Sequence, residues 1–121
     1  MNGGAFLKEA RKLAANRSKF LVTDHARKRD PAKGKDPISD RAILNCINAG
    51  GARVTEGPAP DLKEAGGWKG RISYAEPGTL SEISCVVVPA TRLIIVTAYE
   101  VRVSRRAPKW PPGSPDTGHE V

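Results

Sequence analysis

Short apolar segments separated by turn-forming residues fill residues 52–101, and this spacing constrains the fold more than any other feature of the chain. Segments rich in strand-favouring residues lie at 52–55, 68–75, 82–89 and 92–101. Their connections contain turn residues, including Gly66, Gly67, Pro77 and Gly78. Because the connections are short, consecutive strands are expected to pair antiparallel. The pattern predicts a four-stranded antiparallel sheet.

The first half of the chain has helical patterns. Residues 5–16 place Phe6, Ala10 and Leu13 at helical spacing, with basic residues on the other side. Residues 38–51 contain Ser39, a good N-cap, and end at a Gly pair suited to a left-handed C-cap. With a possible third, short helix near residue 25, the chain is expected to be an α+β protein in which two or three N-terminal helices pack on the sheet.

A chain of 121 residues has room for one compact domain. The expected organisation is an N-terminal amphipathic helix over 1–18, an α+β domain over 19–103 and a Pro-rich, disordered tail over 104–121. Cys46 and Cys85 lie in apolar surroundings without metal-ligand spacing, so buried free thiols are expected. With no membrane-length apolar run and no signal-peptide core, the expected location is the cytoplasm.

The charge distribution indicates an anionic partner. The formal net charge is +7, and residues 1–36 hold 10 Lys or Arg against 4 Asp or Glu, so nearly all of the excess is N-terminal. A basic half of this kind is typical of nucleic-acid binding, although a solvated basic face that keeps the protein soluble is the alternative.

His25 is the leading candidate for acid–base chemistry, since it precedes three cations at the start of a short helix that Thr23 or Asp24 is suited to cap. RNA cleavage without a metal needs a group that takes the 2′-hydroxyl proton and cations that hold the phosphate. The predicted catalytic set is His25, Arg29, Arg71 and Tyr99. The predicted nucleic-acid contacts are Arg27, Lys28, Lys33, Lys35, Lys69 and Thr97. His25 as a capping residue and Tyr99 as an ordinary strand aromatic are the alternatives.

Strand alternation assigns these side chains to faces. Lys69, Arg71 and Ser73 are expected on one face of their strand. Strict alternation in the last strand places Thr97 and Tyr99 on the face that carries Leu93 and Ile95. No zinc motif, phosphate-binding Gly-rich loop or nucleophile-elbow serine is found in the sequence, so no metal or other cofactor is expected.

The order of these motifs resembles a known family. Val22 to Arg29 contains a His-Ala-x-x-Arg pattern, Ile38-Ser39-Asp40 opens the next helix, and the last strand ends in apolar residues followed by Thr97 and Tyr99. Residues 19–101 thus resemble the family catalogued as domain of unknown function 4258. The resemblance implies a fold similar to the RelE and BrnT toxins, with His25, Arg29, Thr97 and Tyr99 as signature residues. The insertion at 30–36 departs from the family pattern.

Two functions follow as expectations. The first is an RNA-binding, metal-independent endoribonuclease toxin of the RelE/BrnT-like type, paired with an acidic antitoxin or immunity protein. The second is a non-catalytic accessory protein of a phage or mobile element that binds a host protein or nucleic acid.

Overall fold

The computed structural model describes residues 1–28 and 36–102. Within them the elements are α1 (Gly3–Ala14), η1 (Arg17–Lys19), β1 (Phe20–Val22), η2 (His25–Arg27), β2 (Asp36–Pro37), α2 (Asp40–Asn48), β3 (Arg53–Pro60), β4 (Trp68–Glu76), β5 (Thr79–Val88) and β6 (Arg92–Arg102), where η marks a 3₁₀ turn. The predicted tail over 104–121 lies outside the described residues.

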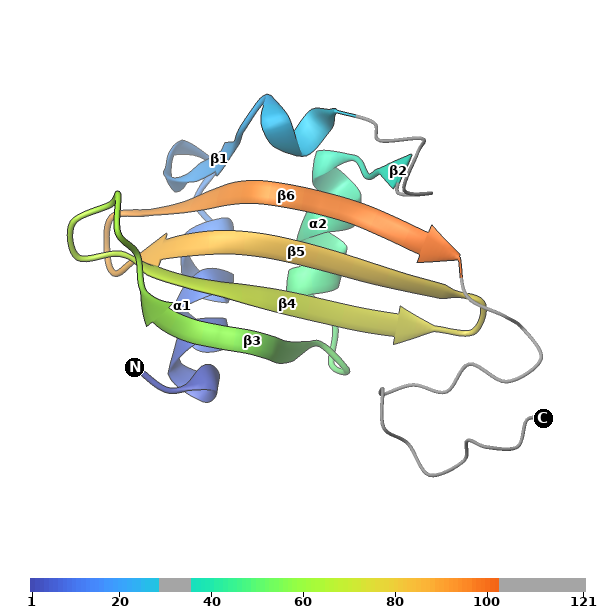
Figure 1. Ribbon diagram of the computed structural model, residues 1–121, viewed down its shortest axis with the longest axis horizontal. Helices are drawn as coiled ribbons and strands as arrows, with labels where there is room; N and C mark the ends of the chain where they lie inside the picture. Colours follow the sequence, from blue (N-terminus) through green and yellow to red (C-terminus); the bar gives the residue numbers. More distant parts are fainter. Residues whose placement is uncertain (29–35, 103–121) are drawn as a thin grey trace.

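Strands β3 to β6 form the predicted antiparallel meander, but the complete sheet is mixed (Figure 1). Five strands follow the order β1-β6-β5-β4-β3, and the two-residue β2 also pairs with β6. β1 runs parallel to β6, with Phe20 opposite Leu93. The prediction of a wholly antiparallel, four-stranded sheet was therefore wrong in this detail, because the three residues of β1 are too few to show a strand pattern. The predicted α+β class is confirmed.

The two described α-helices lie side by side on one face of the sheet (Figure 1). α1 begins at Asn2, whose side chain accepts a hydrogen bond from the amide of Ala5 at 2.7 Å. α2 begins at Ser39, as predicted, where the hydroxyl accepts from the amide of Ala42 at 3.1 Å.

A side chain of α1 forms hydrogen bonds with the C-terminal end of α2. The Arg11 guanidinium donates to the carbonyl oxygens of Ile47 and Ala49, both at 2.8 Å. These are carbonyl groups of the last turn that have no partner within the helix. α2 ends at Asn48, before Gly50. Where a glycine cap was predicted, Arg11 of α1 donates hydrogen bonds to two of the terminal carbonyl groups.

The core lies between the helices and the sheet. Phe6, Ala10 and Leu13 of α1 are buried in it, which confirms the predicted apolar face of the first helix. Cys46 and Cys85 are buried free cysteines, as predicted. Burial is the main reason that the pKa of each thiol is raised to about 12.

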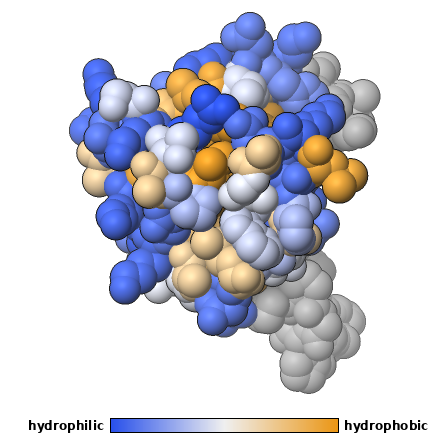
Figure 2. Space-filling model, turned by 90° about the vertical axis from the view of Figure 1, so that its left-hand side faces the viewer, coloured by the Kyte–Doolittle hydropathy of each residue, from blue (hydrophilic) through white to orange (hydrophobic). Residues whose placement is uncertain are grey.

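The side of the molecule on which the β3–β4 connection lies is largely hydrophilic (Figure 2). Figure 2 views the molecule from the side on which the β3–β4 connection lies, and the apolar residues there form only small patches. Leu62, in that connection, is fully exposed. None of the helices in the described ranges has the length and apolarity that a membrane crossing requires.

Candidate functional site

The sheet face opposite the helices carries a cluster of polar side chains. Within residues 1–28 and 36–102 no helix covers this face (Figure 1). Lys69 and Arg71 lie on it, while Ile72, on the opposite side of the strand, is buried in the core. This confirms the predicted alternation in β4.

A bulge decides which side chains of β6 reach this open face. Ser84 pairs with Thr97, whereas the next residue, Cys85, pairs with Ile95, so Val96 is one extra residue in β6. Leu93 and Ile95 face the core, and Thr97 lies on the open face. The predicted grouping of Thr97 and Tyr99 with Leu93 and Ile95 was therefore wrong, because the bulge shifts the alternation by one residue.

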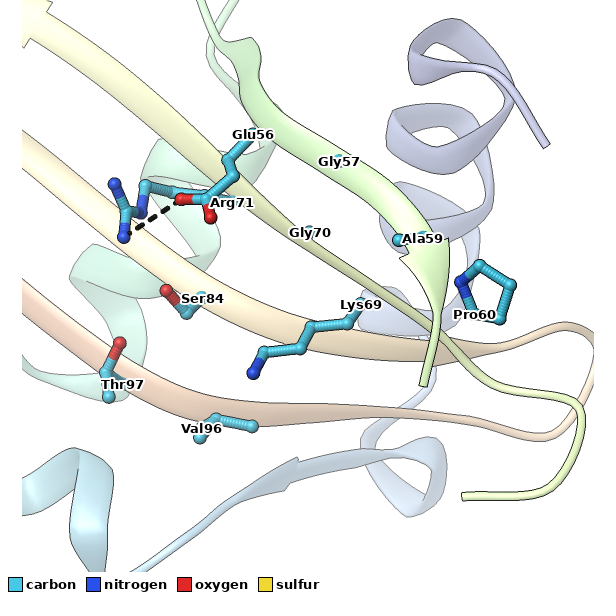
Figure 3. Close-up of a pocket in the computed structure, with 10 residues that line it drawn as sticks. All are labelled: Glu56, Gly57, Ala59, Pro60, Lys69, Gly70, Arg71, Ser84, Val96 and Thr97. Atoms are coloured by element: carbon cyan, nitrogen blue, oxygen red, sulfur yellow. Dashed lines mark ion pairs between the residues drawn. The ribbon is translucent and has the colours of Figure 1, made fainter. Parts of the chain in front are cut away.

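A hollow of about 390 Å³ lies on the open face, bounded on one side by β3 (Figure 3). Its lining includes Glu56, Lys69, Arg71, Ser84, Val96 and Thr97. β3 has two register shifts against β4 in this region, and Gly57, which lies within the second shift, has a φ of 78°. A Cβ atom at Gly57 would lie 2.6 Å from the carbonyl oxygen of Lys69, so only glycine fits this irregular rim of the hollow.

Arg71 is the central cation of the hollow. Its guanidinium forms an ion pair with Glu56 of β3 at 3.2 Å, and the Arg71 side chain is 36% exposed (Figure 3). The Nε atom of Arg71 is buried, and no residue in the described ranges accepts a hydrogen bond from it. A buried donor without an acceptor is costly, and it is the exposed part of the guanidinium, not Nε, that an anionic ligand in the hollow would contact.

Tyr99 and Glu82 form the second polar pair of the open face. They are opposite each other in β6 and β5, and the Tyr99 hydroxyl donates to Oε1 of Glu82 at 2.7 Å. Burial and this hydrogen bond raise the pKa of Tyr99 to about 12, while nearby Arg71 opposes the shift. Tyr99 is therefore a neutral hydrogen-bond donor at physiological pH.

Titration of Tyr99 is expected to show this environment. The chain has two tyrosines, so Tyr74→Phe leaves Tyr99 as the only one. In the folded variant the ultraviolet absorbance of tyrosinate should rise with a midpoint near pH 12, against about 10 in denaturant. Since the folded-state pKa is raised, the stabilisation by neutral Tyr99 is complete below pH ~10 and is lost as the pH rises through the folded pKa. A native midpoint near 10 would contradict the assigned contact with Glu82.

The histidine of the predicted site lies apart from the hollow. His25 is an exposed residue of η2, at the outer edge of β6, and does not belong to the lining of the hollow. The predicted helix at this point is one 3₁₀ turn, and the Thr23 hydroxyl accepts from the amide of Ala26 at 3.2 Å. The same hydroxyl donates to the Ile95 carbonyl at 2.9 Å, which holds the turn against β6.

The remaining predicted cations are dispersed. Arg27 is paired with Asp40 through both terminal guanidinium nitrogens, at 2.9 and 3.2 Å, and so joins η2 to the start of α2. Lys28 is exposed. Arg29, Lys33 and Lys35 fall outside the described residues. Of the predicted site, the structure thus brings together Lys69, Arg71, Thr97 and Tyr99 on one sheet face.

Sequence reasoning missed three polar residues of the open face. Glu56 pairs with Arg71, Glu82 with Tyr99, and Ser84 lies between Arg71 and Thr97 in the sheet register. The sequence signal that could have identified Glu82 was its position opposite Tyr99 in the β5–β6 hairpin. In the described ranges no group of three or more His, Cys, Asp or Glu is arranged to hold a metal ion.

Comparisons of the chain with protein-family models, with curated proteins and with solved structures found no match. The resemblance to domain of unknown function 4258 therefore stays a prediction.

Proposed function

We propose that the protein binds RNA on the open sheet face and cleaves it as a metal-independent endoribonuclease toxin of the RelE/BrnT-like type. The observation that carries the proposal is the cluster of Lys69, Arg71, Thr97, Glu82 and Tyr99 on this one face, around and beside the hollow. A partly exposed guanidinium, a second cation and hydroxyl groups suit a phosphate diester that gains negative charge during cleavage.

The charge of the chain supports an RNA ligand. A net charge of +7 attracts a polyanion and releases its counterions on binding, so affinity should fall steeply with salt. Lys69 makes no ion pair with any described residue, so its ammonium group is free to contact phosphate. As part of the same proposal, an acidic antitoxin or immunity protein would bind this positively charged chain over the open face and block RNA.

The fold also supports the proposal. Helices packed on an antiparallel meander are what the resemblance to the RelE-like toxins implied. Fold likeness alone does not determine activity, so the polar cluster is the stronger support.

Cleavage and binding of a single-stranded RNA test the proposal. The purified protein is expected to cut the RNA in the presence of a chelator, leaving 2′,3′-cyclic phosphate and 5′-hydroxyl ends, and to leave the matching DNA intact. Lys69→Ala is expected to weaken RNA binding about 3- to 10-fold and to reduce the slope of log affinity against log salt by about 1. Lys8→Ala is the matched control, because Lys8 is an exposed lysine of α1 behind the sheet. Equal effects of the two substitutions would contradict binding on the open face.

A second function is favoured by a specific observation. Arg71 and Tyr99 are already engaged by glutamates, and His25 lies away from the hollow. Paired groups of this kind suit a non-catalytic phage or mobile-element accessory protein that binds a nucleic acid or a host protein. RNA binding that depends on Lys69 without any cleavage would select this function over the ribonuclease.

A further inference from the structure

We infer that Glu82, oriented by Tyr99, is the group that accepts the 2′-hydroxyl proton of the RNA, in place of the predicted His25. The inference rests on the proposed ribonuclease function and deepens it. It assigns the base of the reaction to a residue that sequence reasoning did not select.

The position of Glu82 relative to the phosphate-binding residues carries the inference. Ser84 pairs with Arg71 on one side and with Thr97 on the other, which forms one row across the open face. Glu82, two residues away in β5, forms the adjacent row with Tyr99. Residues two apart on a strand share a face and lie about 7 Å apart. A phosphate held at Arg71 therefore has its neighbouring ribose within reach of Glu82.

Electrostatic coupling agrees with this placement. Arg71 lowers the pKa of Tyr99 and Glu56 raises it, so the Arg71–Glu56 ion pair and the hydrogen-bonded pair of Tyr99 and Glu82 interact. The unsatisfied Nε of Arg71 lies in the same group. The side chains of Arg71, Glu56, Tyr99 and Glu82 thus form one polar cluster rather than two separate pairs.

The hydrogen bonding of Glu82 leaves it competent as a base. Tyr99 donates to Oε1, and no hydrogen bond reaches Oε2 from the residues that the structure describes. One carboxylate oxygen is thus held in place while the other can accept a proton. Tyr99 does not compete as the base, because its raised pKa keeps it protonated.

The reaction step balances without a cofactor. Oε2 of Glu82 takes the proton of the 2′-hydroxyl, and the 2′-oxygen forms a bond to phosphorus. The bond from phosphorus to the 5′-oxygen breaks, and that oxygen takes a proton from water. The products are a 2′,3′-cyclic phosphate and a 5′-hydroxyl, and Glu82 then returns its proton to solvent. Arg71 and Lys69 hold the phosphate oxygens as their charge increases.

Single-turnover cleavage by the full chain tests the inference. Glu82→Gln is nearly isosteric and retains an oxygen that accepts from Tyr99, but it cannot take a proton. It is expected to reduce the cleavage rate about 10²- to 10⁴-fold and to change RNA affinity less than about 3-fold. His25→Ala is expected to cleave at a rate within about 3-fold of the wild type. An RNA with a single 2′-deoxy residue at the cut position should resist cleavage by the wild type and by His25→Ala.

Each outcome has a distinct meaning. Cleavage by the wild type together with full activity of Glu82→Gln overturns the role of Glu82 and leaves the ribonuclease proposal standing. Loss of cleavage in His25→Ala, with activity kept in Glu82→Gln, returns the role to His25. RNA left intact by the wild type overturns the ribonuclease proposal itself. If Glu82→Gln does not fold, Tyr99→Phe replaces it, and unchanged cleavage by that variant overturns the positioning role of Tyr99.

Discussion

Replacement of Phe6 by alanine is expected to lower the free energy of unfolding by about 3–5 kcal/mol. Phe6 is fully buried and belongs to the core cluster shared by α1, α2 and the sheet. Its ring lies against Gly70 of β4, where a Cβ atom would be 2.9 Å from Cζ of Phe6. Because Gly70 has no side chain to fill the space left by the ring, the cavity cannot collapse easily.

Urea denaturation followed by circular dichroism measures this effect. Domains of this size are stable by about 5–15 kcal/mol, so Phe6→Ala should shift the midpoint strongly or leave the chain partly unfolded. Lys8→Ala on the exposed side of the same helix is the control and should change stability by less than about 0.5 kcal/mol. A loss below about 1 kcal/mol in Phe6→Ala would show that α1 is not an integral part of the core.

Replacement of Arg71 by alanine is expected to reduce RNA cleavage about 10²- to 10³-fold, the usual cost of removing one preorganised donor to a developing negative charge. The substitution removes the cation of the hollow and its unsatisfied Nε, and it leaves Glu56 without its ion-pair partner. Repulsion between Glu56 and the RNA phosphate then adds to the loss. Arg71→Lys should recover only part of the rate, because lysine keeps the charge but not the planar fork.

Single-turnover rates of purified variants provide the measurement. Arg41→Ala, at an exposed position of α2 behind the sheet, is the control for the loss of one positive charge. It should cleave within about 3-fold of the wild type. Equal losses of cleavage rate in Arg71→Ala and Arg41→Ala would indicate a general charge effect. Full activity of Arg71→Ala would show that the hollow takes no part in the reaction.

Local patterns predicted much of the fold. The apolar spacing of Phe6, Ala10 and Leu13 identified the buried face of α1, and Ser39 marked the start of α2. The turn residues separated β4, β5 and β6, whose antiparallel pairing was predicted from their short connections. These features depend on residues that are neighbours in the sequence.

The remaining features depend on distant partners. The parallel pairing of β1 with β6 joins segments about 70 positions apart in the chain, so no local pattern reports it. The extra residue Val96 in β6 has no signature of its own, and yet it places Thr97 and Tyr99 on the open face. His25 was selected for its intrinsic chemistry, which carries no information on its distance from the other candidates.

By itself, the sequence determined the α+β class, the helix faces and the order of the antiparallel strands, because periodicity and turn chemistry act over a few residues. Only the tertiary structure decided which polar groups meet. The pairing of Arg71 with Glu56 and of Tyr99 with Glu82 follows from strand register and one bulge. The physical reason is that a shift of one residue in register moves a side chain to the opposite face of a sheet.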